Sequence, residues 1–217
     1  MNLKPIFVLV IIISLIMYLS QCKYGAEHQN VEEKYKNAHL TAVSAQNLLK
    51  EKKPAEALKY YEMARAEMEH PNVGADKGED IYINYGFVLN DIGVIHLSWA
   101  LYGKDLATER SHINMATIDH TELALATEAL EISAEFYTRW FKHNPSDYER
   151  YSKAISECYA NLGVAFKYAE QLDKAEDTFR LSLLLNPDNG NAERSLTMLE
   201  INPLPYIEAG KKERELH

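Results

Sequence analysis

The spacing of small and aromatic residues in the last third of the chain most constrains its fold. Tyr159 and Gly163 are four residues apart, so a helix would place them on one face, and Ala175 and Phe179 have the same spacing. Small side chains at Gly163 and Ala175 would let two helices approach closely, with aromatic rings filling the space beside them. Pro187 would end the second helix. The spacing therefore predicts a helical hairpin.

The same residues resemble the signature of the tetratricopeptide repeat. In that signature an aromatic residue, Leu-Gly, a second aromatic residue, Ala, Phe and Pro recur at fixed places in a unit of about 34 residues. The matching residues are Tyr159, Leu162, Gly163, Phe166, Ala175, Phe179 and Pro187. Ser182 stands where a second Ala is usual. A generic helical hairpin is the alternative interpretation.

Two weaker copies of the pattern precede this one. In the first copy the corresponding places are taken by Ala45, Leu48, Ala57, Tyr61 and Ala64. In the second copy Ile92 and Gly93 form the Leu-Gly pair, and Ser133 and Tyr137 fall in a delayed second helix. The resemblance implies an all-α fold, a right-handed superhelix of about three helical hairpins plus a C-terminal capping helix.

The boundaries of this domain follow from turn and cap residues. Asp188 or Asn189 would cap a final helix that ends near Glu200 and shields the apolar end of the stack. A long segment interrupts the second copy and is expected to be a surface insertion. The expected parts are a helical domain at residues 31–200, an insertion at about 103–120 and a C-terminal tail at 201–217.

The N-terminus has the order of a secretory signal. A short charged stretch precedes an apolar run at residues 6–20, which would form a helix of roughly 22 Å. A bilayer core is about 30 Å thick, so this run is too short to span it comfortably. Leu19-Ser20-Gln21-Cys22 resembles a bacterial lipobox, although Gln21 stands where a small residue is usual. An ordinary signal peptide or an uncleaved anchor are the alternatives.

The lipobox resemblance implies a location as well as a modification. Residues 1–21 would be a lipoprotein signal peptide, Cys22 would carry the lipid, and residues 22–30 would be a short tether. Lipid chains contribute about 0.8 kcal/mol per buried methylene and make membrane attachment long-lived. Lys23 rather than Asp after the cysteine favours the outer membrane of a bacterial cell envelope.

Composition narrows the classes of partner. A net charge of -9 argues against nucleic acid, because phosphate binding needs clustered Lys and Arg. The chain has two cysteines, so with Cys22 lipidated no intrachain disulfide would hold the fold. Burial of apolar side chains must then stabilise it.

The sequence favours neither an enzyme nor a metal site. His112, Asp119 and His120 lie close together, but they lack the paired spacing of metal motifs and are expected to be solvated loop residues. Cys158 is expected to be a small buried side chain. We therefore predict no catalytic residue, no cofactor and no metal.

The resemblance also implies a binding groove, because the first helix of each hairpin lines the inner surface of such domains. The groove residues would be Phe87, Asn90, Asp91, Val94, Glu157, Asn161, Val164, Lys167 and Tyr168. Asn90 and Asp91 interrupt an apolar helix, where unpaired polar groups are costly in a core, so a solvent-filled groove explains them more easily. A merely solvated face is the alternative. Asp91 and Glu157 beside aromatic residues suit an apolar or basic peptide.

These features predict a membrane-anchored scaffold or an accessory subunit of a bacterial envelope assembly or transport system. Its partner would be a protein or peptide of the envelope. The alternative is a lipoprotein that binds an apolar small molecule and is associated with a solute transporter. In that case residues 103–120 would close over a cavity between long helices.

Overall fold

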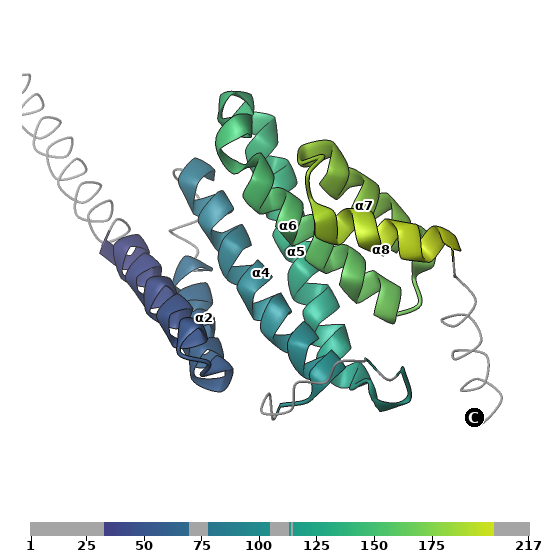
Figure 1. The fold of residues 1–217 in the computed structure, drawn as a ribbon. Coiled ribbons are helices and arrows are strands. Elements are labelled where there is room, and N and C mark those ends of the chain that lie inside the picture. The colour runs from purple at the N-terminus through teal and green to yellow at the C-terminus, as the bar shows by residue number, and fades with distance from the viewer. Residues whose placement is uncertain (1–32, 70–77, 105–112, 114, 202–217) are drawn as a thin grey trace, which may run out of the picture.

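The described part of the chain is all-α, with seven helices packed in sequential pairs. The computed structural model describes residues 33–69, 78–104, 113 and 115–201, and these residues contain no β-strand. Figure 1 shows the helices following one another across the molecule, from α2 at one side to α7 and α8 at the other. The elements are a first helix at residues 33–50, α2 (Pro54–Met68), α4 (Gly78–Tyr102), η1 (Met115–Thr117), α5 (His120–His143), η2 (Pro145–Asp147), α6 (Tyr148–Tyr168), α7 (Leu172–Leu185) and α8 (Gly190–Ile201).

The expected signal peptide, the lipidation site Cys22 and the tether lie outside the described residues, as does the tail beyond Ile201. Among the described helices, none combines the length and the apolar character needed to cross a bilayer.

Two of the helical hairpins have the same turn. In the turn before α2 Lys52 has a φ of 60°, and in the turn before α7 Glu170 has a φ of 60°. This left-handed residue ends each first helix and lets the next amide donate back to it. The donated bonds are both 2.9 Å long, from Lys53 to the carbonyl of Leu48 and from Gln171 to that of Phe166. The first and third predicted hairpins are therefore built alike.

The predicted contact between small and large residues is confirmed in the α6–α7 hairpin. A Cβ atom placed on Gly163 would lie 2.5 Å from Cε1 of Phe179, so only a glycine leaves room for the ring. In the first hairpin Ala45 and Tyr61 hold the equivalent positions, and both are fully buried.

The middle hairpin has a different register from the one predicted. Gly86 faces Tyr137, because a Cβ there would lie 2.6 Å from Cε1 of Tyr137, and Ser133 Oγ donates to the Gly86 carbonyl over 2.7 Å. Gly93 faces Leu130 instead, with a Cβ distance of 2.6 Å to Cγ. The resemblance would place Gly93 opposite Tyr137, whereas the structure places Gly86 there, seven residues (93 − 86) earlier on α4. Seven residues are two helical turns, so both glycines lie on one face of α4.

The described end of the predicted insertion joins α4 to α5. Ile118 is buried, and the amide of Asp119 donates to the carbonyl of Ala100 over 3.1 Å. Asp119 Oδ1 accepts from the amides of Thr121 (3.0 Å) and Glu122 (3.1 Å), which makes it the N-cap of α5. Residues 105–112 and 114 lie outside the description.

The predicted C-terminal helix is present as α8. Asn189 Oδ1 accepts from the amides of Asn191 and Ala192, each over 3.2 Å, and so caps the helix. Its Nδ2 donates to Ser156 Oγ (2.9 Å) on α6 and Ser182 Oγ (3.1 Å) on α7. One buried side chain thus fixes the start of α8 against the α6–α7 hairpin.

Candidate functional site

An open pocket of about 360 Å³ lies between α4, α6 and α8. From α6 it is lined by Ala160, Asn161, Val164, Lys167 and Tyr168, and from α8 by Asn191, Arg194, Ser195 and Met198. Leu101, Tyr102 and Ile113 complete the wall. Residues Asn161, Val164, Lys167 and Tyr168 belong to the groove predicted from the sequence, and the structure brings them together here.

Two of the described residues that line this pocket, Lys167 and Arg194, are basic. Lys167 on α6 is 5% exposed, and its Nζ lies 5.4 Å from the centre of the Tyr168 ring, a cation–π distance. Arg194 on α8 donates from Nε to the Gly190 carbonyl (3.2 Å) and from Nη2 to Asn191 Oδ1 (3.3 Å), which orients its guanidinium group. Among the described residues that line the pocket, none is acidic. The wall therefore suits a group of negative charge.

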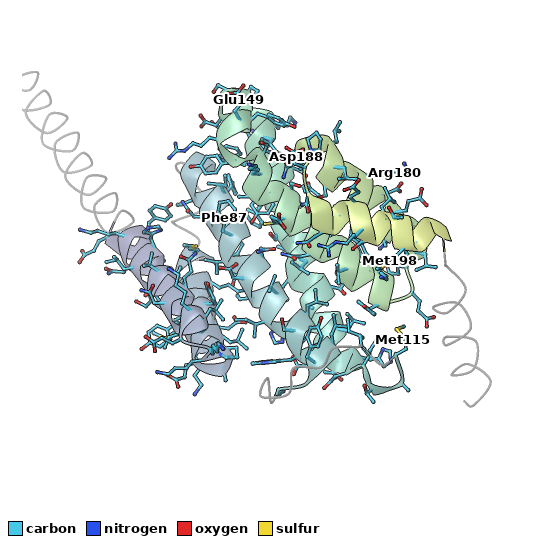
Figure 2. The ribbon with its side chains drawn as sticks, in the orientation of Figure 1. Phe87, Met115, Glu149, Arg180, Asp188 and Met198 are labelled. Atoms are coloured by element: carbon cyan, nitrogen blue, oxygen red, sulfur yellow. The ribbon has the colours of Figure 1, made fainter. Side chains whose placement is uncertain are left out.

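Apolar and aromatic side chains make the rest of the wall. Met198 is 56% exposed, and its flexible thioether side chain adapts to irregular ligands. Tyr102 and Tyr168 add aromatic faces, and Val164 is half-buried. In the view of Figure 2, Met198 lies on α8, well apart from Phe87 on α4.

Asn90 and Asp91 do not line this pocket but belong to a partly buried chain of hydrogen-bonded side chains. Tyr61 on α2 donates its hydroxyl to Asp91 Oδ2 over 2.7 Å. Asn90 Nδ2 donates to Asp91 Oδ1 over 3.3 Å, and Asn161 Nδ2 donates to Asn90 Oδ1 over 3.2 Å. The polar residues that interrupt α4 are thus satisfied by other side chains. This chain of hydrogen bonds reaches the pocket at Asn161.

Burial shifts the pKa values of Asp91 and Tyr61, the two titratable groups of these hydrogen bonds. Burial raises the pKa of the Asp91 carboxyl, while hydrogen bonds from Tyr61, Asn90 and Gln46 oppose the rise. Burial, followed by the charge and hydrogen bond of Asp91, raises the pKa of Tyr61 far above its usual range. Tyr61 therefore remains a hydrogen-bond donor at physiological pH.

The other predicted groove residues lie elsewhere. Phe87 packs with its ring centre 5.4 Å from that of Tyr137 and 6.3 Å from that of Tyr151. Val94 is half-buried on α4, and Glu157 is exposed on α6. None of these three residues is part of the pocket wall.

The residues considered as a nucleophile or as metal ligands are Cys158, Asp119, His120 and His112, and the first two have contacts that stabilise the fold. Cys158 is buried, burial raises the pKa of its thiol to about 12, and its Sγ lies 3.2 Å from the Tyr137 hydroxyl. Such a thiol stays protonated at neutral pH and is a poor nucleophile. Asp119 caps α5, His120 is exposed, and His112 lies outside the described residues. Within the described ranges, no group of three or more His, Cys, Asp or Glu side chains has an arrangement that would hold a metal ion.

The α8 half of the pocket was missed by the sequence analysis. Arg194, Asn191 and Met198 lie on the helix whose predicted role was only to cover the end of the stack. A basic residue and two polar residues one turn apart on that helix are the only sequence features that could have pointed to it.

The chain matches no protein-family model, no curated protein and no solved structure. The function proposed below therefore depends on the pocket and the residues that line it.

Proposed function

We propose that this protein is a non-catalytic, membrane-anchored binding protein of the bacterial cell envelope. The lipid on Cys22 would hold a tetratricopeptide-like domain, a right-handed superhelix, close to the bilayer. Support for the repeat comes from the shared turns at Lys52 and Glu170 and from the contact between Gly163 and Phe179. The domain would serve as a scaffold or accessory subunit of an envelope assembly or transport system.

The pocket between α4, α6 and α8 is the observation that carries this proposal. Its volume of about 360 Å³ fits a few side chains of a partner, and it joins predicted groove residues to exposed residues of α8. Recognition pockets combine an apolar wall with a few placed polar groups, as this one does. The pocket would hold a segment of a protein partner.

The chemistry of the wall favours an acidic segment over a basic one. The expectation of a basic peptide depended on Asp91 and Glu157, and neither lines the pocket. Lys167 on α6 and Arg194 on α8 do line it. We propose a partner segment that carries a carboxylate beside an apolar or aromatic side chain. The carboxylate would bind between the two cations, and the apolar group would pack on Tyr102, Val164 and Met198.

Anchoring would strengthen this interaction without new contacts. A short tether at residues 22–30 would keep the domain near the bilayer surface, which raises its effective concentration toward membrane partners. Fatty-acid labelling of the wild type, with Cys22→Ala as control, tests the anchor.

Affinity purification from envelope extracts tests the pocket. The wild type should recover a partner that is lost with Ser195→Trp, which fills the pocket, and with Arg194→Glu, which reverses a charge in it. The matched controls are Leu184→Trp and Arg180→Glu on the exposed face of α7, and both should retain the partner. Recovery that is unchanged by both pocket variants would exclude this site.

The volume of the pocket also supports the second candidate function, a small-molecule binder. Sites of about 300 to 1,000 Å³ hold small ligands, and Ile113 from the predicted insertion lines this pocket. Native mass spectrometry of the protein purified without unfolding should then show a retained apolar compound that Ser195→Trp displaces. A spectrum of the bare protein would exclude this alternative.

A further inference from the structure

A partly buried chain of hydrogen-bonded side chains links the first hairpin of the molecule to the pocket. Tyr61 comes from α2, Asp91 and Asn90 come from α4, and Asn161 comes from α6. Tyr61 is fully buried, and Asn90 is 8% exposed. Only Asn161 belongs to the pocket wall. The chain therefore connects residues remote from the pocket to one group that a ligand would touch.

The carboxylate of Asp91 fixes the direction of every hydrogen bond in this chain. An ionised carboxylate accepts hydrogen bonds and donates none, so Tyr61 and Asn90 must both donate to it. A hydrogen bond from Gln46 adds a third donor. Because the Nδ2 atom of Asn90 is directed to the carboxylate, its Oδ1 atom must accept from Asn161. A side-chain amide alone could take either orientation, and the charge of Asp91 selects one.

We infer that Asp91 is a positioning residue which turns Asn161 so that its carbonyl oxygen, rather than its amide nitrogen, serves the pocket. No described residue donates a hydrogen bond to Asn161 Oδ1. The occupant of the pocket then supplies an N–H or O–H donor at this point, and in a peptide that donor is a backbone amide. The ligand part of this inference rests on the proposed binding function, whereas the orientation of Asn161 does not.

Hydrogen exchange of side-chain amides tests the orientation. The experiment is ¹⁵N NMR of the full-length protein in detergent micelles. In the wild type one N–H of Asn161 exchanges slowly, because it is bonded to Asn90. Asp91→Asn keeps the side-chain size, but its amide can donate as well as accept. The direction of the Asn90–Asn161 hydrogen bond can then reverse, so exchange of that Asn161 N–H should accelerate about 3- to 10-fold. Equal exchange in wild type and Asp91→Asn would overturn the inference.

Tyr61→Phe is the matched control. It removes one donor to Asp91 and keeps the carboxylate, so exchange at Asn161 should stay within about twofold of wild type. An equal acceleration in both variants would mean a general loosening and would also overturn the positioning role. A neutron crystal structure of the wild type needs no variant. Deuterons on the Asn161 atom that faces Asn90 are expected, and an oxygen in that place would contradict the inference.

A ligand titration separates this inference from the proposed function. The probes are the dipeptide acetyl-Leu-Asp-amide and the same compound methylated at the Asp nitrogen, followed by NMR of the Val164 and Met198 methyl groups. The methylated probe should bind about 3- to 10-fold more weakly to wild type, since it lacks the donor for Asn161. Asp91→Asn should reduce that difference. Equal binding of both probes to wild type would contradict the acceptor role of Asn161. Binding of neither probe would contradict the proposed peptide function and leave the amide-exchange result to decide the orientation.

Discussion

At the scale of single residues, small side chains set the distance between paired helices. Gly163, Gly86 and Gly93 each face a large side chain of the next helix at a distance where a Cβ atom does not fit. The sequence revealed Gly163 because its aromatic and alanine neighbours occur at fixed spacings. Gly86 was not identified because Gly93 lies on the same face of α4, and Ile92-Gly93 resembles the Leu-Gly pair of the repeat.

Gly163→Ala should lower the free energy of unfolding by about 1 to 3 kcal/mol, because the ring of Phe179 must move to admit the methyl group. Urea denaturation measures the change. Gly190→Ala is the matched control, since a Cβ there meets nothing within 4 Å, and it should change stability by less than about 1 kcal/mol. Equal stability of Gly163→Ala and wild type would refute this account of helix packing.

At the scale of elements, the helices were more predictable than their pairing. The start of α8 after Asn189 agrees with the predicted cap, and α4 ends at Tyr102, where the insertion was predicted to begin. The register of α4 against α5 depends on which of two equivalent glycines meets Tyr137, and periodicity alone does not distinguish them. Tertiary contacts, not local propensity, made that choice.

The capping residue Asn189 should contribute to stability through both ends of its amide. Asn189→Ala removes the cap of α8 and one donor to the Ser156 and Ser182 hydroxyls, so the free energy of unfolding should fall by about 1 to 3 kcal/mol. Thermal denaturation and amide exchange in α8 measure this. The neighbouring exposed Asp188 offers the control Asp188→Ala, expected to stay within about 0.5 kcal/mol of wild type. Similar losses in the two variants would contradict the role of Asn189.

The contacts of Glu122 on α5 with His96 on α4 and with Lys104 beyond its end predict a pH dependence. Its Oε2 lies 2.6 Å from His96 Nδ1, and its Oε1 lies 2.7 Å from Lys104 Nζ. Burial opposes the charged form, but the hydrogen bonds from Lys104 and His96 prevail and lower the pKa of Glu122. A lowered folded-state pKa contributes stability above the unfolded-state pKa, and this contribution is lost as pH falls through the folded-state value.

The stability advantage of wild type over Glu122→Gln should therefore shrink as the pH falls from about 6 to 3. Urea denaturation at several pH values measures the difference between the two proteins. Glu131→Gln, on the exposed face of α5, is the control and should show a much flatter difference. An advantage that grows toward acid would contradict the assigned pKa shift.

At the scale of the whole molecule, the pocket that we propose as the binding site forms where α8 packs on α4 and α6. The tetratricopeptide resemblance pointed to the α6 contribution, because the first helix of a repeat would present Asn161, Val164, Lys167 and Tyr168 to the groove. It did not identify Arg194 or Met198, because no local sequence pattern predicts which residues of a terminal helix face the neighbouring helices. It did not predict the hydrogen bond between Asp91 and Tyr61, because these residues are distant in sequence.

Site-specific photocrosslinking in cells tests the central claim most directly. A benzophenone amino acid at Met198, an exposed residue of the pocket, should capture an envelope protein, and the added change Arg194→Glu should abolish the adduct. The same amino acid at Leu184, which is 73% exposed on α7, should capture little. Equal crosslinking at Met198 and Leu184, or an adduct at Met198 that is unaffected by Arg194→Glu, would contradict a partner site between α4, α6 and α8.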